Sequence, residues 1–208
     1  MTSWEREILV VLANHLRILS LAQLARTWWF GQEWGSRSAR QSARALTKDG
    51  WLKTHQVLSR PVTPLAQPLV FWMRGNESPD FEELSRRLHK RARAEASVTT
   101  VVVATRKTRE LFGSGGATGQ IKLTQTTHDL HVGEVFLSYR QHNFDQRRWV
   151  GEDAFRDSWP IRQRPDALLL DEQGNFTRAV EYGGDYSVER LATLHDALAR
   201  IGMSYEIW

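Results

Sequence analysis

Residues 36–52 read SRSARQSARALTKDGWL, and this stretch carries the clearest structural pattern in the chain. Its spacing predicts a helix up to Lys48, with Gly50 just beyond the last turn as the residue that ends it. Arginine and glutamine fall together on one side of that helix, at Arg37, Arg40, Gln41 and Arg44. Small apolar residues fall on the opposite side, at Ala39, Ala43 and Leu46. The stretch therefore predicts a helix with a buried apolar face and a basic outer face.

Two shorter helices are expected before this segment, and two strands after it. Apolar residues recur at helical spacing from Trp4 to Arg17 behind Ser3 as N-cap, and Ser20 precedes a second helix that includes Trp28 and Trp29. β-prone runs at 51–57 and 69–73 flank a proline-rich loop, and we expect them to pair as a wing. The phrase ALTKDGWL at 45–52 resembles the helix-to-wing junction of winged-helix proteins. This resemblance implies a winged helix-turn-helix over residues 1–76.

Positive charge is concentrated in the first half of the chain. Residues 1–96 hold 15 Lys and Arg against 9 Asp and Glu, whereas residues 97–208 hold 13 against 15. Such an excess favours a polyanionic partner, and Arg and Gln are the side chains that pair with guanine and adenine or hold phosphates in a major groove. We expect double-stranded DNA to be contacted by Arg37, Arg40, Gln41, Arg44, Lys48 and Lys53. An ordinary solvated basic face, or a module that docks onto another protein, remains the alternative.

Composition narrows the class of protein. The 208 residues include 41% hydrophobic and 25% charged residues, enough for one larger core or two smaller ones. The absence of cysteine excludes disulfides and thiolate zinc sites. No apolar stretch reaches the roughly 18 residues that a membrane helix needs, and the first residues lack a secretion signal, so a cytoplasmic protein that does not contact a membrane is expected.

The second half of the sequence predicts an α/β domain. A charged helix is expected over 77–97 as a connection, and the type of the segment from 98 to 112 is left open by its composition. From residue 128 the pattern predicts a helix, a segment at 149–155, two strands joined by a turn at 171–175, a helix over 188–200 and a last strand at 204–208. The domain is therefore expected to span 98–208.

That order resembles the core of the PD-(D/E)xK nuclease superfamily, a restriction-endonuclease-like fold. Pro165-Asp166 leads into one strand, Glu181 ends the next, and Glu134 lies in the preceding helix. The resemblance implies that Glu134, Asp166 and Glu181 form a catalytic site, with Asp166 and Glu181 holding Mg²⁺. The family's lysine two positions after the second acid is replaced here by Gly183, which favours a fold that has lost its chemistry. Arg190, one helical turn into the helix that follows, is a candidate to supply the missing positive charge.

The combination also resembles the replication-relaxation proteins of plasmids and conjugative elements. The matching phrases are RPDALLL at 164–170 and AVEYGG at 179–184. The resemblance implies a DNA-binding regulator or accessory factor in the replication, transfer or transcription of a mobile element. Separately, we expect no cofactor, and a homodimer is one assembly considered. The alternative is a Mg²⁺-dependent DNA endonuclease that uses Asp166 and Glu181. A separate cluster, His128, Asp129, His131 and Glu134, has spacing that could also hold a metal.

Overall fold

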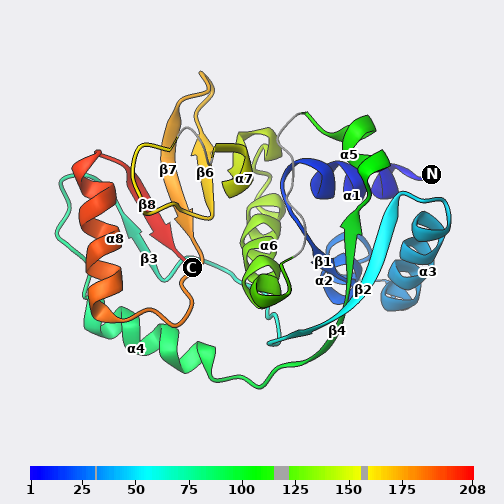
Figure 1. Ribbon diagram of the computed structural model, residues 1–208, viewed down its shortest axis with the longest axis horizontal. Coiled ribbons are helices and arrows are strands. Elements are labelled where there is room, and N and C mark those ends of the chain that lie inside the picture. Colours follow the sequence, from blue (N-terminus) through cyan, green and yellow to red (C-terminus); the bar gives the residue numbers. More distant parts are fainter. Residues whose placement is uncertain (31, 115–121, 156–158) are drawn as a thin grey trace. The chain divides into compact units, whose positions relative to one another are not determined.

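A computed structural model describes residues 1–30, 32–114, 122–155 and 159–208. The fold is of the mixed α+β class, and the chain divides into two compact units, which Figure 1 shows with their elements labelled. Unit 1 contains Met1–Val62 and Ala96–Leu137, and unit 2 contains Thr63–Glu95 and Ser138–Trp208. Each unit is therefore built from two separate stretches of chain. This division differs from the expected ranges 1–76, 77–97 and 98–208.

Unit 1 begins with three helices, and the first two of them start at side-chain caps. The elements in this part are α1 (Ser3–Asn14), β1 (Leu19–Ser20), α2 (Leu21–Trp28) and α3 (Gly35–Lys48). Thr2, rather than the expected Ser3, caps α1 in a reciprocal box with Glu5, and Ser20 caps α2 in the same way with Gln23. The predicted end of α3 is confirmed, because Gly50 follows it with a φ of 75°.

Unit 1 also contains a three-stranded antiparallel sheet with the strand order β1-β4-β2. Strand β2 (Leu52–Ser59) pairs along its whole length with β4 (Ser97–Ala104), from Leu52 opposite Ala104 to Ser59 opposite Ser97. The expectation that 51–57 pairs with 69–73 is wrong, since β3 (Val70–Trp72) belongs to the other sheet. An eight-residue, β-branched partner offers β2 a longer ladder than a three-residue strand does.

The remaining elements of unit 1 follow β4. They are α5 (Arg106–Phe112), a 3₁₀ turn at Leu123–Gln125 and the larger part of α6 (Thr126–Gln141). The segment from 98 to 112, whose type the sequence left open, is thus the end of a strand followed by a short helix. Ile18, Val57 and Leu130 are buried in one apolar cluster of this unit, so α6 and the sheet share a core.

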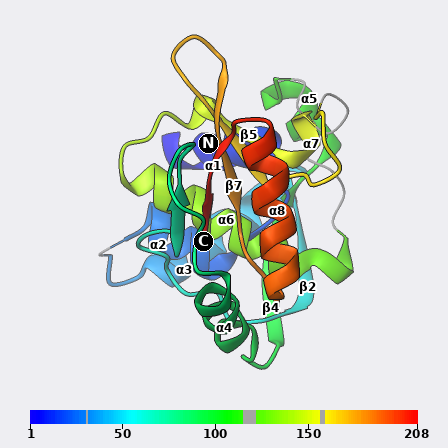
Figure 2. The same ribbon diagram turned by 90° about the vertical axis from the view of Figure 1, so that its left-hand side faces the viewer.

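Unit 2 is a five-stranded mixed sheet with the strand order β3-β8-β7-β6-β5. Its elements are β3, α4 (Phe81–Ala92), a 3₁₀ turn at Gln146–Arg148, β5 (Trp149–Gly151), α7 (Glu152–Phe155), β6 (Ala167–Leu170), β7 (Phe176–Glu181), α8 (Val188–Arg200) and β8 (Ser204–Ile207). Strands β7 and β8 run parallel and α8 connects them, whereas the other neighbours are antiparallel. Figure 2 looks onto α8 where it lies over the strands.

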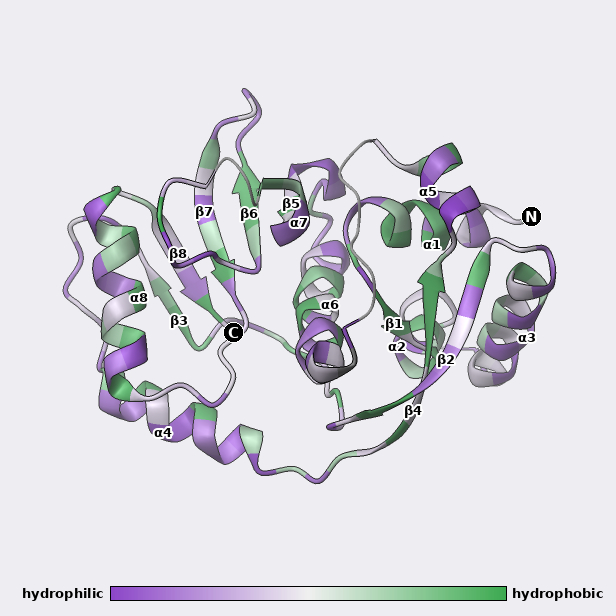
Figure 3. Cartoon of the chain, viewed as in Figure 1, coloured by the Kyte–Doolittle hydropathy of each residue, from purple (hydrophilic) through white to green (hydrophobic). Residues whose placement is uncertain are grey.

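Apolar side chains from α4, α8 and the sheet form the core of unit 2. Leu88 of α4, Leu191 of α8 and Ile207 of β8 are each about 1% exposed and belong to one cluster. Figure 3 shows the contrast in hydropathy between the largely apolar β4 and the polar outer faces of α3 and α4. None of the helices within the described ranges is long and apolar enough to cross a membrane.

Candidate nucleic-acid interface and acidic site

The apolar side of α3 is held inside unit 1, as its sequence predicts. Ala39, Ala43 and Leu46 are all less than 5% exposed. Ser42, which lies on the same buried side, donates a hydrogen bond of 2.6 Å to Oε1 of Glu5 in α1. A direct hydrogen bond of 3.1 Å between the hydroxyls of Thr47 and Thr54 joins the last turn of α3 to β2. These contacts fix which way the opposite side of the helix points.

The basic side of α3 is exposed to solvent. Arg37, Arg40, Gln41 and Arg44 line a shallow hollow of about 440 Å³, and we call the three arginines the arginine row. The Arg37 guanidinium lies 5.0 Å from the centre of the Trp34 ring, and Arg40 Nε donates to the Ser36 carbonyl oxygen at 3.1 Å. None of the three forms an ion pair with a carboxylate among the described residues. The row therefore presents unneutralised positive charge.

Lys48 and Lys53, the other two residues predicted to contact DNA, are also exposed. Lys48 lies in the last turn of α3, and Lys53 lies near the start of β2. At the far end of the same strand pair, Leu58 and Val98 stand directly opposite each other and are 68% and 66% exposed. The described surface of this sheet thus has a basic end beside α3 and an apolar end where the two strands leave it.

Asp166, just before β6, and Glu181, the last residue of β7, are neighbours, as the resemblance to nucleases implies. Ala167 pairs with Val180, so the next position of the antiparallel ladder places Asp166 opposite Glu181. Oδ2 of Asp166 accepts a hydrogen bond of 2.8 Å from the Tyr182 amide, and Glu181 is only 5% exposed. The pair therefore lies at the end of the unit 2 sheet where β6 begins and β7 ends.

Tyr186, which lies just before α8, contacts this end of the sheet. Its hydroxyl donates a short hydrogen bond to Oε1 of Glu181. Burial raises the pKa of the Tyr186 phenol, and the negative charges of Glu181 and Asp166 raise it further, so the hydroxyl keeps its proton. Arg190 stacks on the same ring with its guanidinium carbon 3.8 Å from the centre. Tyr186 thus holds a carboxylate with its hydroxyl and an arginine with its ring.

A cavity of about 590 Å³ opens beside these residues, and we call it the arginine hollow. Its described lining contains the arginines Arg162, Arg164 and Arg190, the acids Glu152 and Glu181, and Gln163, Tyr186, Thr193 and Leu194. Three arginines and two acids therefore line one cavity. Arg190 lies where the sequence proposed it as a source of positive charge.

Gly183, which stands where the nuclease family has its lysine, is closely packed against neighbouring side chains. A Cβ atom at Gly183 would lie 2.8 Å and 2.9 Å from the two Cδ atoms of Leu88 and 3.0 Å from Cγ2 of Ile207. Leu88 belongs to α4, whose Arg91 also donates to the carbonyl oxygens of Gly183 and Trp208. Helix α4 therefore fills the space in which a side chain from residue 183 would have to lie.

The magnesium site that the nuclease resemblance implies is only partly assembled among the described residues. Mg²⁺ binds oxygen ligands, and two of the expected carboxylates do meet at the sheet edge. Over the described ranges, however, no group of three or more histidine, aspartate or glutamate side chains is placed to hold a metal. Three arginines line the adjoining hollow, and their charge opposes a divalent cation.

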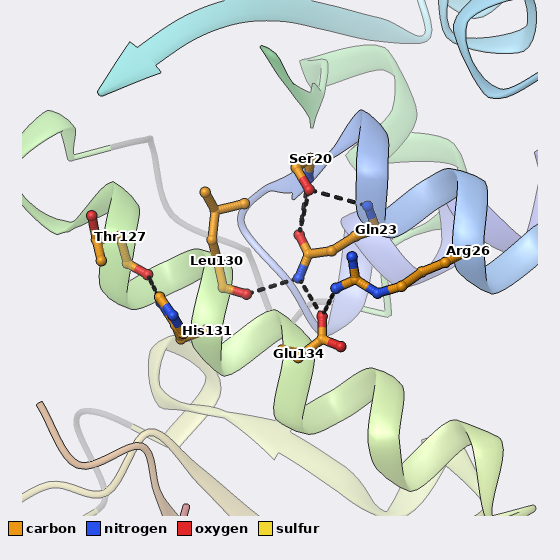
Figure 4. A network of polar contacts seen from close by, with 7 residues as sticks. All are labelled: Ser20, Gln23, Arg26, Thr127, Leu130, His131 and Glu134. Atoms are coloured by element: carbon orange, nitrogen blue, oxygen red, sulfur yellow. Dashed lines mark hydrogen bonds and ion pairs between the residues drawn. The ribbon is translucent and has the colours of Figure 1, made fainter. Parts of the chain in front are cut away.

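Glu134, the third predicted acid, has a different role from the one expected. It is 3% exposed in unit 1, where its carboxylate pairs with Arg26 and accepts a hydrogen bond of 3.1 Å from Nε2 of Gln23. Figure 4 shows the side chains of Gln23 and Arg26, both from α2, pointing toward Glu134. Gln23 Nε2 also donates to the Leu130 carbonyl at 2.8 Å. Glu134 therefore joins α2 to α6 within unit 1.

The residues around Glu134 do not form the alternative metal cluster either. Asp129 forms an ion pair of 3.0 Å with Arg17, and Nδ1 of His131 lies 2.7 Å from the Thr127 carbonyl oxygen. These contacts direct both side chains toward protein groups. The spacing of His128, Asp129, His131 and Glu134 is thus that of an ordinary helix joined to its neighbours.

Several residues that line the arginine hollow were not predicted as site residues from the sequence, although Arg164 begins the phrase RPDALLL. Arg162 and Arg164 come from an irregular stretch before β6, and Thr193 lies a turn beyond Arg190 on α8. Their convergence depends on how the segment before β6 meets α8, which no local spacing encodes. A search for arginines flanking the Asp166 and Glu181 strands would have been the nearest available clue.

Comparison with protein-family models, curated proteins and solved structures gives no match to this chain.

Proposed function

We propose that this protein binds double-stranded DNA, with α3 entering the major groove. The observation that carries the proposal is the arginine row, exposed along one side of a helix whose other side is buried. Arg and Gln in such a row can pair with guanine and adenine edges or hold phosphate oxygens. Because no described carboxylate neutralises the row, its charge is available to a polyanion.

The order of elements in unit 1 supports a winged helix-turn-helix. Helices α2 and α3 follow each other, and β2 leaves α3 to pair antiparallel with β4, which also pairs with β1. In this proposal the wing consists of β2 and β4, and residues 60–96 are an insertion between its strands. Lys53, at the base of the wing, then contacts the phosphate backbone beside α3.

For unit 2 we propose a nuclease-like domain without nuclease activity. Three antiparallel strands, a crossing helix and a parallel strand follow one another, which is the order that the resemblance to PD-(D/E)xK proteins implies. The closed position at Gly183 and the arginines around Glu181 argue against the metal chemistry of that fold. With the phrases at 164–170 and 179–184, this supports a regulator or accessory factor of a mobile element.

Duplex binding, followed by fluorescence anisotropy at several salt concentrations, tests the proposal. Replacing Arg40 and Arg44 together by alanine should lower the affinity by roughly thirtyfold or more, because each contact contributes about 1–3 kcal/mol. The slope of log affinity against log salt should become shallower by about two, one for each lost phosphate contact.

The matched control replaces Arg147 and Arg200 by alanine, which removes the same charge from exposed positions of unit 2. It should leave both the affinity and the slope nearly unchanged. If the α3 variant binds duplex as tightly as the control, the proposal is wrong and a protein-docking role for unit 1 gains support.

Incubation with supercoiled and linear DNA in Mg²⁺ or Mn²⁺ tests the proposal for unit 2. We expect both substrates to stay intact. Nicking that is lost in Asp166→Asn would instead establish a metal-dependent endonuclease.

A further inference from the structure

We propose that the arginine hollow of unit 2 is an anion site that binds a phosphate monoester directly, without a metal ion. The proposal does not depend on DNA binding by α3, since every residue that it uses belongs to unit 2. Its first support is shape. A cavity of about 590 Å³ falls within the roughly 300–1,000 Å³ of small-molecule sites, so it is large enough for a nucleotide-sized ligand.

The second support is the charge of the lining. Arg162, Arg164 and Arg190 form no ion pair with any carboxylate within the described ranges, although Glu152 and Glu181 line the same cavity. Positive charges on three arginines that line one cavity repel each other, and an anion bound among them offsets that repulsion. A divalent cation in the same place would add to it.

The third support is that one of these arginines is held in place. Arg190 stacks on Tyr186 at 3.8 Å, and the Tyr186 hydroxyl is in turn held by Glu181. The buried acid therefore acts through Tyr186 to position an arginine, and its carboxylate need not contact a ligand. An arginine whose place is already fixed loses less conformational freedom on binding.

The chemistry of arginine selects the ligand class. The planar guanidinium presents a fork of N–H donors that matches the oxygens of phosphate, often through two parallel hydrogen bonds. Gln163 and Thr193 add neutral groups to the described lining that can hydrogen-bond to a sugar or a base. A terminal phosphate on a nucleotide or on a DNA end supplies this combination, whereas a phosphodiester within a duplex carries one charge fewer.

Isothermal titration calorimetry on the full chain, in buffer with a metal chelator, tests the site. The probes are a deoxynucleoside 5′-monophosphate, the matching nucleoside, inorganic phosphate, and a short single-stranded oligonucleotide with or without a 5′-phosphate. The monophosphate should bind and the nucleoside should not. Tighter binding of the 5′-phosphorylated oligonucleotide than of the monophosphate would identify a DNA end as the source. The reverse order would identify a free nucleotide.

Variants separate this site from a metal site. Arg162→Gln with Arg190→Gln should weaken monophosphate binding by about tenfold or more, because hydrogen bonds to charged groups are among the stronger ones. Arg200→Gln, an exposed arginine at the other end of α8, is the matched control and should leave it unchanged.

Glu181→Gln gives the sharpest result, since glutamine can still accept the Tyr186 hydrogen bond but carries no charge. It should retain or strengthen phosphate binding. Binding that requires Mg²⁺ and disappears in Glu181→Gln would overturn the proposal in favour of a metal site. Absence of monophosphate, phosphate and oligonucleotide binding to the unaltered protein would overturn it outright, whether or not duplex DNA binds to α3.

Discussion

The arginine row of unit 1 and the arginine hollow of unit 2 use the same side chain in two different shapes. The row lies on the convex outside of α3, spaced at Arg37, Arg40 and Arg44 along the helix. The hollow gathers Arg162, Arg164 and Arg190 from separate segments around a cavity. Charges spread along a helix suit an extended polyanion, whereas charges gathered in a concavity suit one compact anion. In the two proposals, the surface shape, rather than the count of arginines, is what separates the two classes of ligand.

Arg26 differs from both sets of arginines because it pairs with the buried carboxylate of Glu134. Removing that carboxylate should have the largest effect on stability. Glu134→Ala leaves Arg26 and Gln23 without their shared acceptor, with the Arg26 side chain only 24% exposed. We expect unit 1 to lose about 3 kcal/mol of unfolding free energy. Urea unfolding followed by tryptophan fluorescence measures this loss. Glu134→Gln, which keeps the shape, should lose less. A loss below about 1 kcal/mol for the alanine variant would show that the Glu134–Arg26 ion pair contributes no more than an exposed surface pair.

Crossing the variants with the ligands tests whether the row and the hollow are independent. Arg40→Ala with Arg44→Ala should reduce duplex affinity roughly thirtyfold and change monophosphate affinity by less than about twofold. Arg162→Gln with Arg190→Gln should do the reverse. Anisotropy and calorimetry on both variants measure the four affinities. If each variant weakens both ligands equally, the two sets of arginines serve one binding surface and the contrast between them fails.

The closed position beside the hollow should be sensitive to a single methyl group. Gly183→Ala places a Cβ against Leu88 and Ile207, and we expect unit 2 to lose about 1–3 kcal/mol through overpacking. Gly184→Ala is the control, since its nearest neighbour would be Cε1 of Tyr186 at an ordinary 3.7 Å. Thermal unfolding of both variants gives the comparison. Equal stability would mean that α4 yields easily and that a side chain at 183 is tolerated.

The smallest expected effect is that of pH on the two ligands. A phosphate monoester takes up a proton near pH 6, whereas the phosphodiesters of a duplex do not ionise in this range. Lowering the pH from about 7.5 to about 5.5 should therefore weaken monophosphate binding about fourfold, if the dianion is the bound form. The described lining of the hollow contains no histidine that would oppose this trend. Duplex binding to the row should change less over the same range, and a parallel loss would point to a titrating group on the protein.

Local sequence patterns predicted most of the helices, but not the partners of strands or of charges. Helix α8 spans the expected 188–200, because helical periodicity is a local property. The proximity of Asp166 and Glu181 was expected only from the resemblance to nucleases. The partner of β2 could not be predicted in the same way. Residues 69–73 and 97–104 are both β-prone, and only tertiary packing selects between them. Glu134 was assigned by analogy to the acid pair, whereas its neighbours Gln23 and Arg26 come from a distant part of the chain.

The pairing of β2 with β4 has a consequence for how the molecule can be dissected. A fragment that ends at residue 76 would contain β2 without β4, so the small sheet would lose its central strand. The fragment that begins at residue 77 would lack β3, and the large sheet would lose an edge strand. No single cut in the polypeptide yields either half intact. Isolating unit 1 requires ending the chain at residue 137, excising residues 63–95 and bridging the gap with a short turn, in the manner of a shortened hairpin.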